Sequence, residues 1–367
     1  MKQSFFLLVF IAFNSISCGD TETSLIGQLE VTSMVNPNVG ILIKNNNLAV
    51  TLTDEQTILG IGSGLIFESH DNFNSFQVSG PFENDLSKVV YMTGNAIICY
   101  QPPYNSIYDP FTLYRSTDKG TTWKKSVIQN IDNDYSRGFE ILRIQFINDN
   151  QGFMLVNNWS YSDPANTLVY KLDLDKSEAV LVGQVDGYLA AEMKFWDANN
   201  GYVLLRAYLP NNNMLNAYIS RTSDGGAMWS TPSPVDVNNR LSNVELIDSN
   251  TIIIFDYSLA YHSVDAGMNW KKIEVSAIVN DMSFINNTTG FSIDGFGAVS
   301  KTTNAGLNWT LAGNIVVPGD FGGEFSKINF YNNNVGIVYG RNQLYSTNDG
   351  GKSWNILIYP FWYVTGD

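Results

Sequence analysis

The stretch from Ser300 to Trp309, which reads S-K-T-T-N-A-G-L-N-W, contains the pattern on which the fold depends. Within it, a hydroxyl residue, an amide residue, a glycine and a tryptophan follow one another as Thr302-x-Asn304-x-Gly306-x-x-Trp309. The same order, with an aspartate in place of the amide residue, recurs elsewhere in the chain at Asp118, Asp224, Asp265 and Asp349, with the final tryptophan at Trp123, Trp229, Trp270 and Trp354. An eroded copy at Asp71 precedes them all and ends in Phe76. A short motif that recurs in this way predicts a protein built from repeated structural units.

The residue types of the motif point to a structural turn. A carboxylate or amide at a tight turn accepts hydrogen bonds from backbone N–H groups ahead of it, and a nearby hydroxyl is a second local partner. A glycine two positions later adopts a positive φ without a steric penalty, and the tryptophan packs its ring on the sheet. We therefore predict a structural role, not a catalytic one, for Asp71, Asp118, Asp224, Asp265, Asn304 and Asp349 and for Trp123, Trp229, Trp270, Trp309 and Trp354.

The repeat is longer than the motif. Each unit contains three short apolar runs with alternating polar residues, then the turn, then a fourth run that begins at the tryptophan, as expected for four β-strands. A weaker unit occupies the long gap between Asp118 and Asp224 and ends in the decayed motif Asp173-Leu-Asp175-Lys-Ser177. These units predict an all-β, seven-bladed β-propeller, with eight blades as the alternative. Residues 25–44 either close the ring or belong to an extra blade.

The composition excludes several classes of function. The chain has 35 acidic and 21 basic residues, which disfavours binding to nucleic acid or to an anionic membrane surface. Cys99 lies in an apolar run and is expected to be a buried free thiol, so no disulfide framework is predicted. The two histidines, His70 and His262, both fall at the predicted turns, which argues against a histidine-dependent triad. We predict neither a metal site nor a cofactor.

The N-terminus predicts export. A short apolar run follows Met1-Lys2, and Ser15-Ile-Ser-Cys18 is similar to the looser lipoboxes of Bacteroidetes lipoproteins. We therefore expect a signal peptide at 1–17, a lipidated Cys18 with a tether at 18–24, and a single propeller domain at 25–367. The expected location is the outer membrane, facing the periplasm or the cell surface, with membrane contact through the lipid alone; secretion without lipid is the alternative.

The motif also resembles the Asp box, or BNR repeat, of β-propellers. The segment Gly295–Trp309 is similar to the Ycf48-like family of seven-bladed propellers, whose founding members are thylakoid-lumen assembly factors that bind a photosystem subunit without catalysing a reaction. This resemblance implies a propeller that acts as a non-catalytic binding or assembly scaffold. The recognition surface of that family is arginine-rich, whereas this chain has seven scattered arginines, so the photosynthetic partner is not carried over.

Three predicted connections between second and third strands are unusually long and rich in aromatic residues. They belong to the second, third and fourth units, so they extend one side of one face of the ring. Aromatic anchors of this kind suit a protein segment or stacked sugar rings. The predicted binding residues are Tyr104, Tyr108, Phe111, Trp159, Tyr161 and Tyr208. The alternative is that these side chains pack within their own loops. We expect a monomer whose partner is an envelope protein or a glycan.

A carbohydrate-active hydrolase is the competing function. Sialidases, which also contain Asp boxes, need three arginines around a carboxylate, and the first lies in an Arg-Ile-Pro segment before the first box. This chain has no arginine before Arg115 and no such segment, so that site cannot be assembled in the usual way. A glycoside hydrolase that pairs Asp163 with Asp109 or Asp134 is the remaining alternative, because two carboxylates suffice for that chemistry.

Overall fold

A computed structural model describes residues 49–52, 58–62, 65–71, 77–79, 88–92, 96–101, 111–118, 121–128, 138–159, 166–207, 216–236, 241–256, 259–274, 279–317, 325–340 and 343–358. The predicted leader, Cys18 and residues 25–44 lie outside this set. The described part of the chain contains no helix with the length and apolar character needed to traverse a bilayer.

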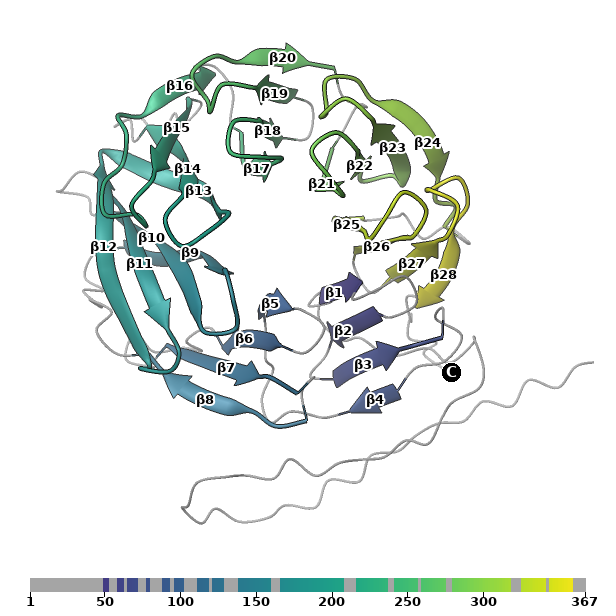
Figure 1. Cartoon of the computed structure of the whole chain (residues 1–367), viewed down its shortest axis with the longest axis horizontal. Helices are drawn as coiled ribbons and strands as arrows, with labels where there is room; N and C mark the ends of the chain where they lie inside the picture. Colours follow the sequence, from purple (N-terminus) through teal and green to yellow (C-terminus); the bar gives the residue numbers. More distant parts are fainter. Residues whose placement is uncertain are drawn as a thin grey trace, which may run out of the picture.

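The described residues form seven four-stranded antiparallel sheets, and every sheet is built from four strands that are consecutive in the sequence. Figure 1 shows these sheets arranged around a common centre, with the first strand of each sheet innermost and the fourth outermost. The eight-bladed alternative is therefore wrong for this part of the chain. The long gap between Asp118 and Asp224 holds one complete extra sheet, which is the weak unit with the decayed motif.

The first three blades contain β1 (Ala49–Leu52), β2 (Ile58–Gly62), β3 (Leu65–Ser69) and β4 (Gln77–Ser79); β5 (Lys88–Met92), β6 (Ile97–Gln101), β7 (Thr112–Ser116) and β8 (Lys124–Val127); and β9 (Gly138–Phe146), β10 (Gln151–Trp159), β11 (Asn166–Asp173) and β12 (Glu178–Asp186). Blades four and five contain β13 (Tyr188–Phe195), β14 (Gly201–Ala207), β15 (Ala217–Thr222) and β16 (Ser233–Asp236); and β17 (Asn243–Leu246), β18 (Ile252–Asp256), β19 (Leu259–Ser263) and β20 (Lys271–Ile273). Blades six and seven contain β21 (Asp281–Phe284), β22 (Gly290–Ile293), β23 (Ala298–Thr302) and β24 (Thr310–Asn314); and β25 (Lys327–Phe330), β26 (Gly336–Gly340), β27 (Gln343–Thr347) and β28 (Asn355–Ile358).

The ring closes by packing between its first and last blades. Strand β1 contacts β25 and β26 on one side and β5 on the other. Tyr339 of β26 is hydrogen-bonded to the backbone of Val50 in β1, and burial raises the pKa of its hydroxyl. No described sheet mixes strands from the two ends of the chain. Closure within this part of the molecule therefore depends on side-chain contact, not on a shared strand.

The hydrophobic core is divided into clusters, each of which lies between two neighbouring blades. One cluster joins Ile98 and Leu113 of blade two to Met154 and Tyr170 of blade three, and comparable clusters join the later blades. Because both faces of a middle strand are covered, β18 has four successive buried residues, whereas the outermost β24 is largely exposed. Cys99 is fully buried in β6, as expected, and burial raises the pKa of its thiol to about 12.

Candidate functional site

In the recurring turns around Asp71, Asp118, Asp224, Asp265, Asn304 and Asp349, here called the box turns, the leading hydroxyl donates to the acidic or amide side chain two residues ahead. In blade six, Thr302 Oγ1 donates to Asn304 Oδ1 at 3.0 Å, and the Asn308 N–H donates to the same oxygen at 3.0 Å. The Gly306 N–H donates to Thr302 Oγ1 at 3.0 Å from a residue with φ of 83°. Trp309 Nε1 donates to the Gly306 carbonyl at 2.9 Å. The polar groups of this turn are therefore occupied by one another.

Box turns also connect neighbouring blades. The Ala305 carbonyl of the blade-six turn lies 2.8 Å from Nε2 of His262 in blade five, and burial lowers the pKa of that histidine. Ser233 Oγ of blade four donates to the Gly267 carbonyl in the blade-five turn at 3.4 Å. Gly226 of the blade-four turn approaches Val169 and Val182 of blade three. The turns thus form the outer joints of the ring, which supports a structural role for their acidic residues.

A second recurring turn supports the box turns and was not recognised in the sequence. It joins the first and second strands, and its leading side chain accepts backbone N–H groups two and three residues ahead. Its members are Asn148, Asp197, Asp248, Asn286 and Asn332. The backbone of this turn then accepts an N–H from the box turn, as Thr288 does from Ala305 at 2.8 Å. An Asn or Asp recurs shortly before the second strand in blades three to seven, and this recurrence could have identified the turn from the sequence.

Most of the predicted aromatic binding residues lie outside the described residues. These are Tyr104, Tyr108, Tyr161 and Tyr208, and the proposed hydrolase carboxylates Asp109, Asp134 and Asp163 also fall there. The backbone of Trp159 ends β10 and pairs with Gly138 of β9. Phe111 is 5% exposed and packs in the core between blades two and three, so its side chain serves that core. The structure therefore brings none of these side chains together in a described site.

The centre of the ring contains a group of charged side chains that sequence reasoning did not single out. They come from the innermost strands of five consecutive blades and form three pairs of opposite charge. Arg143 Nε lies 2.8 Å from Glu192 Oε2, Lys194 Nζ 3.6 Å from Glu245 Oε2, and Lys327 Nζ 3.0 Å from Asp281 Oδ1. Each pair joins two adjacent blades, and we call these six residues the hub.

The basic members of the hub are more accessible than the acidic ones. The Arg143, Lys194 and Lys327 side chains are 44%, 40% and 53% exposed, against 12%, 20% and 18% for their partners. Long basic side chains present their charged ends to water while their stems cover apolar surface. The hub of this acidic chain therefore presents cationic ends, behind which the carboxylates are partly covered.

The carboxylates of the hub differ in how firmly they are held. Asp281 accepts the Ile328 N–H at 3.0 Å in addition to Lys327, and Glu192 accepts the Met193 N–H at 3.0 Å in addition to Arg143. Glu245 pairs with Lys194, and burial raises the pKa of its carboxyl despite the attraction of that lysine. The pKa values of the two lysines are also raised, which for a lysine favours the charged form. Glu245 raises the pKa of Lys194, and Asp281 raises that of Lys327 against the effect of burial.

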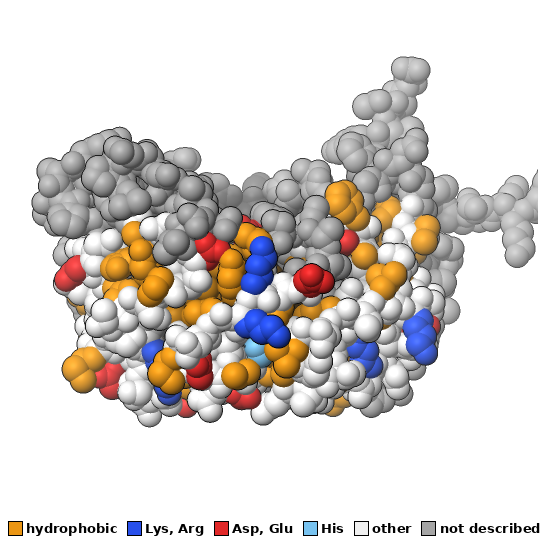
Figure 2. All heavy atoms as spheres, turned by 90° about the horizontal axis from the view of Figure 1, so that it is seen from above, with side chains coloured by type: hydrophobic (Ala, Val, Ile, Leu, Met, Phe, Trp, Pro, Cys, Tyr) orange, Lys and Arg blue, Asp and Glu red, His pale blue; other side chains and the backbone are white. Residues whose placement is uncertain are grey.

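This arrangement is better suited to binding than to acid–base chemistry. A glycosidase needs two carboxylates that are free to transfer a proton or attack a sugar. Two of the three hub carboxylates are instead bound on both oxygens by a cation and a backbone N–H. Within the described residues, no group of three or more histidine, cysteine or acidic side chains is placed to hold a metal ion. On the face shown in Figure 2, acidic, basic and hydrophobic side chains are interspersed without a single charged zone.

The fold is shared with solved propellers of several kinds. A structure described as YCF48 bound to D1 peptide matches with a TM-score of 0.58 at 13% identity, covering 90% of this chain and 96% of that chain. YCF48 from Cyanidioschyzon merolae matches at 0.53 and 13% identity, covering 89% and 99%. Oligogalacturonate lyase from Vibrio parahaemolyticus matches at 0.51 and 10% identity, covering 88% and 90%. At these identities the likeness shows the β-propeller fold, which binding proteins and enzymes both use.

Among curated proteins, the chain is 34% identical over 100 residues to the chloroplastic photosystem II stability/assembly factor HCF136 of Arabidopsis thaliana. The match covers 25% of this chain and 25% of that protein, so the chain spans about a quarter of its length. No family model matches the chain. The comparisons thus define the class of protein, an all-β propeller with local similarity to an assembly factor.

Proposed function

We propose that this protein is a non-catalytic binding scaffold that holds a polypeptide segment of a partner on one face of its ring. The observation that carries the proposal is the hub. Each of its three carboxylates is paired with a cation from a neighbouring blade, while the cationic ends stay accessible. Such pairs fix the blades relative to one another and leave donors that suit peptide carbonyl and carboxylate groups. The peptide-bound YCF48 structure, which has the same fold, supports a polypeptide ligand.

The aromatic connections of blades two to four are proposed as the second part of the binding surface. Their predicted anchors are Tyr104, Tyr108, Trp159, Tyr161 and Tyr208. Aromatic side chains dominate binding energy at protein interfaces, and they also stack on sugars. A glycan is therefore the other ligand that these loops could take.

Affinity capture from an envelope fraction tests the proposal. The full chain and its Lys194→Gln/Lys327→Gln and Trp159→Ala variants would be compared, with Lys272→Gln as the control because Lys272 is exposed on the outer strand β20. We expect the hub and Trp159 variants to recover a specific polypeptide about tenfold less well than wild type, while the control recovers it fully. Equal recovery by all variants, with folding verified by circular dichroism, would contradict the proposed surface. Retention on a glycan array without a polypeptide partner would favour the glycan.

The second candidate function, a glycoside hydrolase, is favoured by the raised pKa of Glu245, because a general acid needs a carboxyl that holds its proton more firmly than usual. Its test is hydrolysis of a panel of polysaccharides by wild type and Glu245→Gln. Turnover that Glu245→Gln abolishes would establish the enzyme and overturn the scaffold.

We further propose that the protein is exported and anchored by a lipid on Cys18, as the lipobox-like segment predicts. Expression with a labelled fatty acid in a bacterial host checks this directly. Wild type should carry the label and fractionate with membranes, whereas Cys18→Ser should do neither. Label on the variant would contradict modification at that cysteine.

A further inference from the structure

The joints between blades contain a recurring basic residue. It lies on the third strand, opposite a hydrophobic or aromatic residue of the second strand. Strand register places it at Arg115, Lys171, Arg221, His262 and Lys301 in blades two to six. In blade five this residue reaches the next box turn, as the 2.8 Å contact between His262 and the Ala305 carbonyl shows. At Arg115 and His262 the position therefore connects one blade to the next.

The joint between blades two and three shows how a carboxylate completes such a contact. Arg115 Nη2 lies 2.7 Å from Asp175 Oδ1 of blade three, and Arg115 Nη1 donates to Asn150 Oδ1 at 3.2 Å. Lys124 Nζ, from the fourth strand of blade two, is 4.0 Å from the same Asp175 oxygen. One carboxylate from the following blade is thus held by two cations of the preceding blade and lies next to an asparagine.

The joint between blades six and seven has the same construction without that carboxylate. Lys301 takes the place of Arg115, and Thr310, which pairs with Lys301 as Lys124 pairs with Arg115, takes the place of Lys124. Asn334 takes the place of Asn150. The backbone carbonyl of Asn334 accepts the Gly350 N–H, as that of Asn150 accepts the Leu174 N–H. The residue after the turn N–H that bonds this asparagine is Asp175 in blade three and Gly351 in blade seven, and Lys352 next to Gly351 supplies a second cation.

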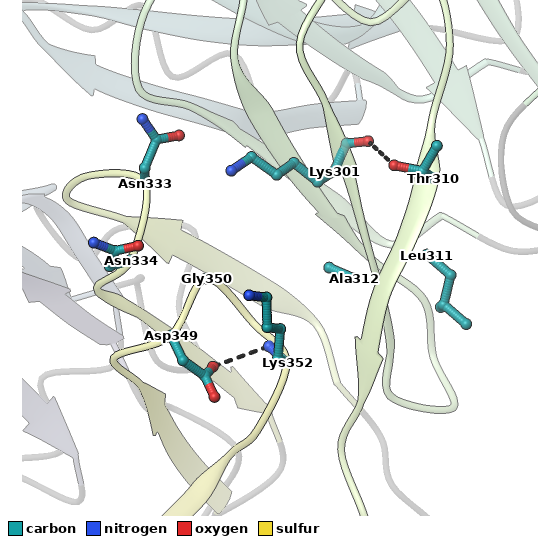
Figure 3. Close-up of a pocket in the computed structure, with 9 residues that line it drawn as sticks. All are labelled: Lys301, Thr310, Leu311, Ala312, Asn333, Asn334, Asp349, Gly350 and Lys352. Atoms are coloured by element: carbon teal, nitrogen blue, oxygen red, sulfur yellow. Dashed lines mark hydrogen bonds between the residues drawn. The ribbon is translucent and has the colours of Figure 1, made fainter.

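A hollow of about 270 Å³ lies between these groups, and it is lined by Lys301, Lys352, Thr310, Asn333 and Asn334 among others. Figure 3 shows the Lys301 side chain directed across the hollow towards Asn333, and Lys352 entering it from the opposite wall. Lys301 Nζ lies 5.0 Å from the centre of the Phe291 ring. Among the described residues, no carboxylate oxygen is within 4.0 Å of either ammonium group.

Asp349 also borders the hollow, but its carboxylate is committed to its own turn. Its oxygens accept hydrogen bonds from Thr347 Oγ1 at 2.8 Å, from the Lys352 and Ser353 N–H groups at 3.0 Å each, and from Ser353 Oγ at 2.5 Å. In Figure 3 it is turned towards the Lys352 backbone and away from the Lys301 ammonium. The two ammonium groups therefore face a space that lacks the acceptor present at the equivalent joint.

We propose that this hollow binds the carboxylate of an aspartate or glutamate side chain from a partner polypeptide, held by Lys301 and Lys352. The internal template is itself an aspartate, and a charge-assisted contact from two ammonium groups is the strongest interaction that the hollow offers. The polypeptide source rests on the proposed function, whereas the carboxylate site does not. A sugar acid carries the same group and is the competing source.

Amide chemical shifts measured while acetate is added to the full chain test the site, with neutral acetamide as the ligand control. Acetate should shift the amide signals of Lys301, Lys352 and their neighbours, and acetamide should not. Lys301→Gln and Lys352→Gln should each weaken acetate binding about tenfold, and Lys272→Gln, which removes the same charge from the blade-five outer strand, should leave it unchanged. Unchanged affinity in both site variants, or equal loss in Lys272→Gln, would overturn the site.

Lys352→Asp supplies a second, independent readout because it puts a carboxylate in place of an ammonium group at the wall of the hollow that Lys301 also lines. We expect this variant to lose acetate binding and to melt at a higher temperature than Lys352→Gln; a lower melting temperature would contradict the charge argument. A glutamate-rich peptide and oligogalacturonate then distinguish the sources. Competition with acetate by the peptide supports a polypeptide partner, and competition by oligogalacturonate alone overturns that part. Loss of acetate binding with unchanged partner capture would separate this site from the proposed function.

Discussion

The box turns and the hub show two different uses of polar residues in one ring. In a box turn, the donors and acceptors belong to residues a few positions apart, so the same bonds recur from blade to blade, as at Asn304 and Asp349. At the hub, each contact joins residues about fifty positions apart in different blades, such as Arg143 and Glu192. Repeated residues therefore maintain the architecture, while the residues that differ between blades give the hub its own arrangement of charges.

Blade three shows how a blade is held when the residues of its box turn are partly lost. Its box has lost the glycine and the tryptophan, yet Asp173 Oδ1 still accepts the Asp175 and Lys176 N–H groups at 3.1 and 3.2 Å. The blade compensates with longer strands, nine residues in β9, β10 and β12, compared with four or five in blade six. A box can therefore decay where extended pairing holds the blade, whereas the close joints elsewhere depend on the turn.

The largest effect is expected where a box turn meets the neighbouring backbone. A methyl group on Gly183 of β12 would overlap the Gly226 carbonyl of the blade-four turn, and backbone atoms cannot move aside cheaply. Gly183→Ala should lower the free energy of unfolding by about 3 kcal/mol. Gly187→Ala is the matched control, since its methyl would meet no atom within 4 Å and its φ of 78° costs about 1 kcal/mol. If urea denaturation showed a similar loss of unfolding free energy for both variants, the joint between Gly183 and the blade-four turn would not be tightly packed.

A smaller effect is expected inside a box turn. Asp349→Ala removes the acceptor of four hydrogen bonds and should cost about 1–2 kcal/mol at pH 7. Asp349→Asn should cost less, because Asn304 fills the same position in blade six. Burial opposes ionisation of Asp349, but the hydrogen bonds prevail and lower its pKa to about 2.

The pH dependence of the Asp349 variants follows from that lowered pKa. Since the folded carboxyl is the stronger acid, its stabilising contribution is present above its ordinary pKa of 3.8 and is lost as the pH falls towards 2. The difference in unfolding free energy between wild type and Asp349→Ala should shrink over that range. A difference that stays constant between pH 5 and pH 2.5 would contradict the role of the ionised carboxylate.

The smallest effect is expected at the hub. Glu245→Gln should change the unfolding free energy by less than about 1 kcal/mol at neutral pH, because its partner Lys194 is 40% exposed and can be solvated. Burial raises the pKa of Glu245, so the folded state binds the extra proton and loses stability as the pH rises from 4.5 through the raised value. Wild type should therefore lose stability relative to Glu245→Gln across that window. The opposite slope in pH-dependent denaturation would show that Lys194 outweighs burial.

Sequence reasoning identified the turns and missed the hub for the same physical reason. The bonds of a box turn connect neighbours in the chain, so residue types at fixed spacing reveal them, and Thr302, Asn304 and Gly306 lie as predicted. The hub pairs connect residues such as Lys194 and Glu245, which stand among ordinary strand residues. The aromatic loops were distinguished by composition, which identifies a candidate surface but not the arrangement of its side chains.

The sequence alone determined the four-stranded repeat, the chemistry of its turns and the burial of Cys99, since each follows from local residue order and hydrophobic alternation. The tertiary structure decided which blades touch, how β1 packs against β25 and β26, and which charges meet at the hub and at the joint between blades six and seven. Those contacts join segments far apart in the chain. Their geometry depends on how the whole ring packs, which no local pattern specifies.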